Sequence, residues 1–155
     1  TQLIGKTNQF NLSTKRHSIE TVRRFSENEK MFTFCYQAED KYGDSGIIGI
    51  LIAAIENQSV VVDTFLMSCR VMNRGIENSM INHLIGWSAD RDIRSIEATY
   101  VESNKNAPVL EALIKMSFTK LNDIADRIKF EYEVHNGAIN GSYADIKIHK
   151  QTKSS

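Results

Sequence analysis

The chain has 155 residues, 41% of them hydrophobic and 25% charged, and its 19 basic residues balance its 19 acidic ones. This is the composition of one globular domain, and the lack of a basic excess argues against nucleic-acid binding. No apolar run reaches the roughly 18–20 residues of a membrane span, and no signal peptide opens the chain. We therefore expect a cytoplasmic protein without nucleic-acid or membrane partners, with one domain over residues 1–150 and a frayed tail over 151–155.

The first half of the chain predicts mostly strands. Ile19, Val22 and Phe25 recur at helical spacing, and Ser18 is suited to cap the start of that helix. A turn at Tyr42–Gly46 separates two strand-like runs. The expected elements are a strand at 9–13, a helix at 18–28, and strands at 31–36, 47–55 and 60–67. The last two are long apolar runs joined by a short turn, which indicates central antiparallel strands buried on both faces.

The second half alternates helices and strands. Apolar residues at helical spacing predict a helix over 74–90, and Pro108 is tolerated in the first turn of a second helix over 106–118. A strand is expected at 95–101, and alternation at 130–134 and 146–148 predicts a closing hairpin. The resulting fold class is α/β (α+β), with a mixed, mostly antiparallel central sheet flanked by helices, in the order of the GNAT fold.

Metal and disulfide sites are not indicated by the sequence. Cys35 and Cys69 are the only cysteines, without a CxxC pair, and the four histidines have no ligand spacing. Two lone cysteines fit a reducing compartment. We predict no metal site, no disulfide between the two cysteines, and two unreactive thiols.

Five blocks of sequence, spread over about three quarters of the chain, resemble the GNAT-like C-terminal region of FkbH-type proteins. They are Lys6–Ser13, Tyr42–Gly46, Asp63–Val71, Asn73–Glu77 and Lys105–Val109. The resemblance implies a HAD-like region earlier in the same full-length chain, which loads a glyceryl group onto an acyl carrier protein for polyketide extender units. The HAD signature DxDx[TV] is absent here. The chain is therefore expected to be the second half alone, and glyceryl loading is not assigned to it.

GNAT proteins hold the pyrophosphate of CoA at the start of the central helix, in an Arg/Gln-x-x-Gly-x-Gly/Ala pattern. Free N–H groups at a helix N-terminus point toward the anion, and glycines let the backbone approach it. The resemblance carries the binding of CoA, or of an acyl-phosphopantetheine arm, onto nine residues of this chain. They are Ser68, Cys69, Arg70, Val71, Asn73, Arg74, Gly75, Ile76 and Asn106.

This chain departs from the GNAT pattern at both ends of the motif. Met72 replaces the basic residue and Glu77 replaces the last small residue. A carboxylate there suits the helix dipole but repels a diphosphate, so we predict weak binding of free CoA. The phosphopantetheine arm of a carrier protein has one phosphate, so Glu77 repels it less strongly. Arg70 and Arg74 could face that phosphate or the acidic surface of the carrier, or they could be ordinary solvated arginines.

Asp63 interrupts the apolar strand at 60–67, and a carboxylate there needs an explanation. One interpretation is a general base poised by burial; in the other, Asp63 bonds a neighbouring backbone group or caps an adjacent segment. Cys69 has no histidine fixed beside it, so a small core thiol is favoured over a nucleophile.

The last predicted helix lacks a residue that GNAT enzymes commonly use there. The position of their acidic Tyr falls on Leu113, and the usual Gly near the end of the helix is Ser117. Asn106 matches an Asn that GNAT proteins commonly keep, although an ordinary N-cap explains it equally well. The missing Tyr argues against ordinary acetyl transfer. Three hypotheses remain: an acyltransferase acting on a carrier arm, a non-catalytic module that docks the carrier, and a CoA-dependent N-acetyltransferase.

Overall fold

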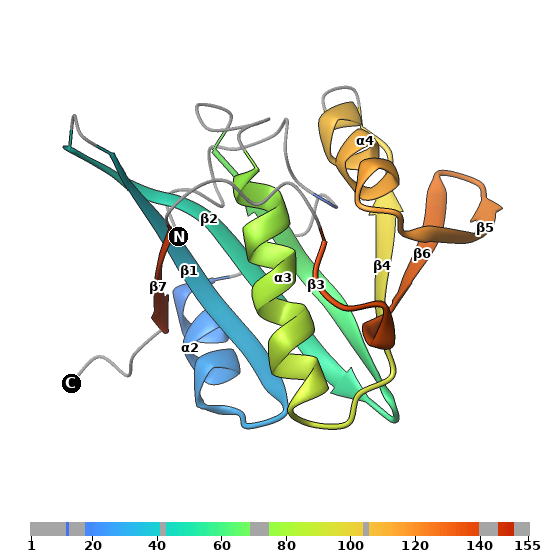
Figure 1. The fold of residues 1–155 in the computed structure, drawn as a ribbon, viewed down its shortest axis with the longest axis horizontal. Helices are drawn as coiled ribbons and strands as arrows, with labels where there is room; N and C mark the ends of the chain where they lie inside the picture. The colour runs from blue at the N-terminus through green and yellow to red at the C-terminus, as the bar shows by residue number, and fades with distance from the viewer. Residues whose placement is uncertain are drawn as a thin grey trace.

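The computed structural model describes residues 12, 18–40, 43–68, 75–103, 106–139 and 146–150. A seven-stranded sheet in the order β5-β6-β4-β3-β2-β1-β7 forms the middle layer. The helix α2 lies behind this sheet and α3 crosses its front (Figure 1). The elements are α2 Ile19–Glu27, β1 Met31–Asp40, β2 Gly43–Glu56, β3 Ser59–Met67, α3 Ile76–Ala89, β4 Ser95–Val101, α4 Ala107–Lys115, β5 Thr119–Ile124, β6 Arg127–Glu133, the 3-10 turn η2 Val134–Asn136, and β7 Ile146–Lys150.

The predicted fold class is confirmed. β2 is antiparallel to β1 and to β3, β6 is antiparallel to β4 and to β5, and β7 is antiparallel to β1; β3 and β4 form the parallel pair. The central antiparallel strands are buried on both faces, as predicted. Ile50, Ile52 and Leu66 face α2, whereas Leu51 and Phe65 belong to the larger core cluster that includes α3.

Local signals placed the helices well. The Ser18 Oγ accepts a hydrogen bond from the Thr21 N–H at 3.1 Å and caps α2 as predicted. The helix α4 ends earlier than expected, because Ser117 adopts a left-handed φ of 67°. The Phe118 N–H then bonds the Leu113 carbonyl at 3.1 Å, which closes the helix end in the way a C-terminal glycine usually does.

Two expectations about pairing are wrong. Residues 43–46 belong to β2 rather than to a turn, because Asp44 and Gly43 pair with Glu39 and Asp40 and extend the β1–β2 hairpin. The predicted closing hairpin does not form either. β6 pairs with β4 and with β5, a strand that the sequence analysis missed, and β7 pairs with β1 at the opposite edge of the sheet. The strand predicted at 9–13 lies outside the described residues except for Leu12.

The physical reason for the missed strand is its exposure. Every side chain of β5 is exposed, so its sequence carries no alternation between buried and exposed positions. The strand is specified by its pairing with β6 and by the tight turn at Ala125, whose φ is 57°. A pattern based on burial cannot detect such a strand.

Candidate functional site

The two parallel strands at the centre of the sheet separate from one another. β3 and β4 pair only over Ser59–Val62 and Ser95–Ala98, although β3 continues to Met67 and β4 to Val101. The separation begins at an irregularity in β3. Val62 pairs with Ala53 of β2, and Thr64 pairs with the next residue of β2, Ile52, so Asp63 is an extra residue. An extra residue of this kind bends and twists a strand, which turns the end of β3 away from β4.

The bulge at Asp63 also explains how apolar residues on both sides of it reach the same face of β3. Val60 and Val62 before the bulge, and Phe65 and Met67 after it, all belong to the core cluster on the α3 side. Without the extra residue, strand alternation would send the second pair to the other face. One residue therefore both opens the gap and keeps the end of β3 packed under α3.

Asp63, the proposed general base, lies half-buried at this bulge. Its Oδ2 accepts a hydrogen bond from the Thr64 hydroxyl at 2.8 Å, and Thr64 itself is only 3% exposed. This bond comes from a side-chain hydroxyl, whereas the simpler interpretation expected a backbone partner or a cap, so that interpretation also stays a prediction. A carboxylate that accepts a bond from a hydroxyl can still accept a proton, so the role of Asp63 as a base stays a prediction.

The gap between β3 and β4 is bridged by the main chain of Leu12. Its N–H donates to the Phe65 carbonyl of β3 at 3.0 Å, and its carbonyl accepts from the Val101 N–H of β4 at 3.1 Å. The Leu12 side chain is fully buried in the larger core cluster. One residue thus satisfies, through its N–H and its carbonyl, one acceptor and one donor that the separated strands would otherwise leave unpaired.

The predicted phosphate-binding stretch at the start of α3 is described only at its ends. Ser68 is buried, and its N–H donates to the Ile48 carbonyl at 2.7 Å. Gly75 has a left-handed φ of 79° and leaves α3 without a side-chain cap, and Ile76 is buried in the core. The other predicted residues of the stretch, Cys69, Arg70, Val71, Asn73 and Arg74, lie outside the described residues.

Glu77 occupies the first turn of α3 and is unusually buried for a carboxylate. Its side chain is 9% exposed, and its Oε2 has no hydrogen-bond partner among the described residues. Burying a carboxylate oxygen without a partner is costly. The positive end of the α3 dipole, at the N-terminus of the helix, stabilises the charge of this carboxylate and offsets part of that cost.

Asn106 connects the start of α4 to the gap. It is 1% exposed; its Oδ1 accepts from the Tyr100 hydroxyl at 2.9 Å and from the Ser103 N–H at 2.8 Å. Its Nδ2 donates to the carbonyl of Val101, the residue whose N–H bonds Leu12. Asn106 stands at the N-cap position of α4, as the simpler interpretation expected, but its side chain makes no capping bond to the helix. Asn106 instead fixes the end of β4.

Tyr100 was not among the predicted site residues. Burial, and to a lesser extent the charge of Glu102, raises the pKa of its hydroxyl, which therefore stays protonated and donates to Asn106. The sequence did contain one signal for Tyr100: it lies two residues after Ala98 in the predicted strand, so both side chains point to the inward face. Leu113, which we predicted to stand where GNAT enzymes commonly have a tyrosine, is fully buried, and its side chain contributes packing.

The structure describes part of what the sequence predicted about cysteines, metal sites and membrane spans. Cys35 is a buried free cysteine, and Cys69 lies outside the described residues. Within the described ranges, no group of three His, Cys, Asp or Glu side chains could hold a metal ion, and no helix is long and apolar enough to cross a membrane.

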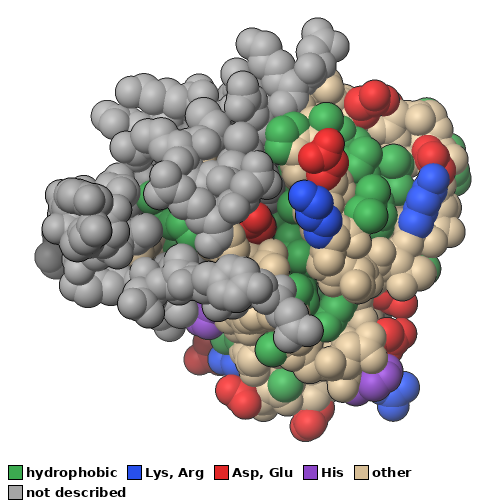
Figure 2. Space-filling view, turned by 45° about the horizontal axis from the view of Figure 1, so that its top comes forward, with side chains coloured by type: hydrophobic (Ala, Val, Ile, Leu, Met, Phe, Trp, Pro, Cys, Tyr) green, Lys and Arg blue, Asp and Glu red, His purple; other side chains and the backbone are tan. Residues whose placement is uncertain are grey.

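Hydrophobic side chains gather over α4 and the β5–β6 hairpin in Figure 2, where Ile114, Leu121 and Ile124 are exposed.

Comparison with known proteins identifies this architecture. No protein-family model matches the chain, and no curated protein matches it in sequence. Among solved structures, it is similar to the ribosomal-protein-S18-alanine N-acetyltransferase from Escherichia coli, with a TM-score of 0.59 and 13% identity over 77% of this chain and 79% of that one. A GNAT-family acetyltransferase from Staphylococcus aureus Mu50 gives a TM-score of 0.57 and 11% identity over 74% and 75% of the two chains.

A third similar structure is the PaiA N-acetyltransferase from Thermoplasma acidophilum in complex with coenzyme A, with a TM-score of 0.50 and 12% identity over 57% of this chain and 55% of that one. At such identities the likeness concerns the fold. The chain therefore has the fold of the GNAT acetyltransferases, with the parallel pair β3–β4 and the start of α3 at its centre.

Proposed function

We propose that this chain is an acyltransferase-type GNAT domain that handles an acyl group on the phosphopantetheine arm of an acyl carrier protein. The observation that carries the proposal is the gap between β3 and β4. At this gap the Phe65 carbonyl and the Val101 N–H bond the N–H and the carbonyl of Leu12. A phosphopantetheine arm is a narrow chain with two amides and can make the same pair of bonds. To lie there, it must displace Leu12.

The start of α3 supports a carrier arm over free CoA. Gly75 allows a close backbone approach, and the N-terminus of α3 favours an anion. The buried carboxylate of Glu77 in the same turn repels each phosphate that approaches. CoA brings a diphosphate and a further ribose phosphate, whereas the carrier arm brings one phosphate. Repulsion by Glu77 therefore penalises CoA more strongly.

The resemblance to FkbH-type proteins supplies the proposed partners. They are an acyl carrier protein and a HAD-like region in the same full-length chain, in polyketide-type metabolism. Carrier proteins are acidic, and Arg70 and Arg74 precede the start of α3, so we propose that the carrier docks there. Changing both arginines to Glu should weaken binding of the carrier more than the same change at Arg23 and Arg24, which are exposed on α2.

The second candidate, a non-catalytic docking module, is favoured by two observations. The main chain of Leu12 already fills the gap, and Leu113 is buried where a GNAT enzyme would place its acid. The third candidate is a CoA-dependent N-acetyltransferase, the activity named for the E. coli structure. Glu77 weighs against it for the reason given above.

Calorimetry with the loaded carrier and with acetyl-CoA tests the proposal. We expect the unmodified chain to bind acetyl-CoA weakly, and Glu77→Gln to tighten that binding about tenfold by removing one buried charge. Glu20→Gln is the matched control, because Glu20 occupies the same first-turn position of α2 but is exposed. Low-micromolar affinity of the unmodified chain for acetyl-CoA would contradict the proposal.

The rate of acyl loss from the carrier separates the first two candidates. If Asp63 is a general base, Asp63→Asn should slow transfer by about 10²–10⁴-fold without weakening carrier binding. If the unmodified chain and Asp63→Asn both bind the carrier tightly and neither transfers the acyl group, the docking module is favoured.

A further inference from the structure

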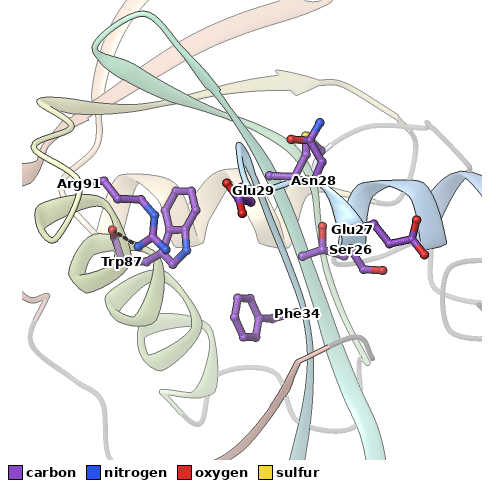
Figure 3. A pocket seen from close by; sticks show the side chains of 9 residues that line it. Ser26, Glu27, Asn28, Glu29, Phe34, Trp87 and Arg91 are labelled. Atoms are coloured by element: carbon purple, nitrogen blue, oxygen red, sulfur yellow. Dashed lines mark hydrogen bonds between the residues drawn. The ribbon is translucent and has the colours of Figure 1, made fainter. Parts of the chain in front are cut away.

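A separate cavity of about 520 Å³ lies at the other end of α3. It is bounded by the end of α2 with the turn that follows, by the first half of β1, and by Trp87 and Arg91 at the C-terminal end of α3. In Figure 3, Trp87 and Arg91 face Ser26 and Glu27 across the opening, with Phe34 and Glu29 between them. Trp87 is eleven residues beyond Ile76, or about 16 Å along the helix, so this cavity is distinct from the gap between β3 and β4.

The position of β7 leaves this corner of the sheet open. β7 pairs with β1 only from Phe34 to Ala38. Among the described residues, no strand therefore borders Met31–Thr33 on that side. Side chains alternate between the two faces of a strand, so the cavity meets Phe34 on the α3 side and Thr33 on the α2 side of the sheet. A ligand here can contact both faces of the sheet at once.

One wall of the cavity is aromatic and rigidly supported. Phe32 packs edge-on against Trp87, with ring centroids 5.4 Å apart, and lies 4.5 Å from Phe34. The guanidinium of Arg91 lies 4.0 Å from the centroid of the Trp87 ring, and its Nη1 donates to the Trp87 carbonyl at 3.0 Å. The indole face already attracts one cation, and Phe34 offers an apolar surface beside it.

The opposite wall is polar and incompletely paired. Thr33 is 3% exposed, lines the cavity, and its Oγ1 has no hydrogen-bond partner in the described part of the chain. A buried hydroxyl of this kind is costly unless something bonds it. Glu27 and Glu29 also line the cavity, and neither forms an ion pair with another described residue. Arg91 provides the only positive charge among the lining residues, so the cavity has a net negative charge.

We propose that this cavity is a binding site for a small organic cation, a primary ammonium group carried on an aromatic or alkyl body. The body packs on Phe34 and the edge of Trp87. The ammonium donates hydrogen bonds to the Thr33 hydroxyl and to the carboxylate of Glu29, which satisfies the unpaired oxygen and neutralises the excess negative charge. The site is independent of acyl transfer, because none of its residues lies at the gap or at the start of α3.

The chain provides its own probe for a test. Trp87 is the only tryptophan, so its fluorescence reports on this cavity directly. We expect a saturable change in fluorescence on titration with 2-phenylethylammonium and none with 2-phenylethanol, which has the same body without the charge. Saturation by the alcohol at the same concentration, or tighter binding of 3-phenylpropionate, would overturn the assignment of a cation. A signal that rises linearly with every compound would overturn the site itself.

Two variants locate the contacts. Thr33→Val keeps the shape and strand preference of the side chain and should weaken 2-phenylethylammonium binding about tenfold. It should also raise the melting temperature of the ligand-free protein, because it removes the unpaired hydroxyl. Glu29→Gln should weaken binding about fivefold, whereas Glu111→Gln, on an exposed position of α4, should not change it. Unchanged affinity in both Thr33→Val and Glu29→Gln would overturn the proposal.

Discussion

β1, β2 and β3 are joined along almost their whole lengths, whereas β3 and β4 share only the four pairs from Ser59–Ser95 to Val62–Ala98. The antiparallel half is also covered on both faces, by α2 and α3 (Figure 1). The junction between β3 and β4 depends on other groups: the main chain of Leu12 and the side chain of Asn106. The first region stabilises the fold, and the second is the place where we propose that the carrier arm binds.

The largest effect is expected at the junction, from Asn106→Ala. The change removes the partner of the Tyr100 hydroxyl, of the Ser103 N–H and of the Val101 carbonyl in a buried setting. We expect a loss of about 2–4 kcal/mol in the free energy of unfolding, measured by urea denaturation. Asn122→Ala, on the exposed strand β5, should change it by less than about 0.5 kcal/mol. Equal losses in the two variants would show that the junction does not depend on Asn106.

A smaller loss is expected in the antiparallel half, from Gly49→Ala. A Cβ at this position would lie 2.9 Å from the Met80 Sδ and Cε atoms and 3.2 Å from the Leu66 carbonyl oxygen. Met80 is fully buried, so the end of its side chain would have to shift within a packed core, at a cost of about 1–3 kcal/mol.

Gly86→Ala is the matched control for this contact. Gly86 lies on the exposed side of α3, and an added Cβ would meet nothing within 4 Å. Alanine is the better helix former, so we expect a gain of about 0.5–1 kcal/mol. A gain at Gly49, measured in the same denaturation series, would contradict the close packing of β2 against α3.

The smallest effect is expected from Ser117→Gly, beyond the end of α4. Ser117 has a φ of 67°, a region that disfavours residues with a Cβ, and glycine removes that strain. We expect a gain of about 1 kcal/mol in thermal or urea denaturation. Ser117→Ala keeps the Cβ and should bring no gain; an equal gain with alanine would mean that the hydroxyl, not the backbone, was unfavourable.

The sequence by itself determined the elements that carry local signals. Ser18 fixed the start of α2, the apolar spacing after Gly75 fixed α3, and the bounds of β4 were predicted as Ser95–Val101. The long apolar runs of β2 and β3 showed that these strands lie at the centre of the sheet. Each of these features depends on residues within one or two turns or one strand, which is the range over which caps and periodicity act.

The tertiary structure decided what depends on distant partners. The place of β7 beside β1, the exposed strand β5, and the position of Leu12 between β3 and β4 leave no local pattern in the sequence. The burial of Glu77 and the unpaired hydroxyl of Thr33 were equally hidden, because whether a polar atom finds a partner is set by the elements packed around it. Both proposed sites depend on these features. Whether a buried polar group has a partner can be seen only when the whole sheet and the helices packed on it are in place.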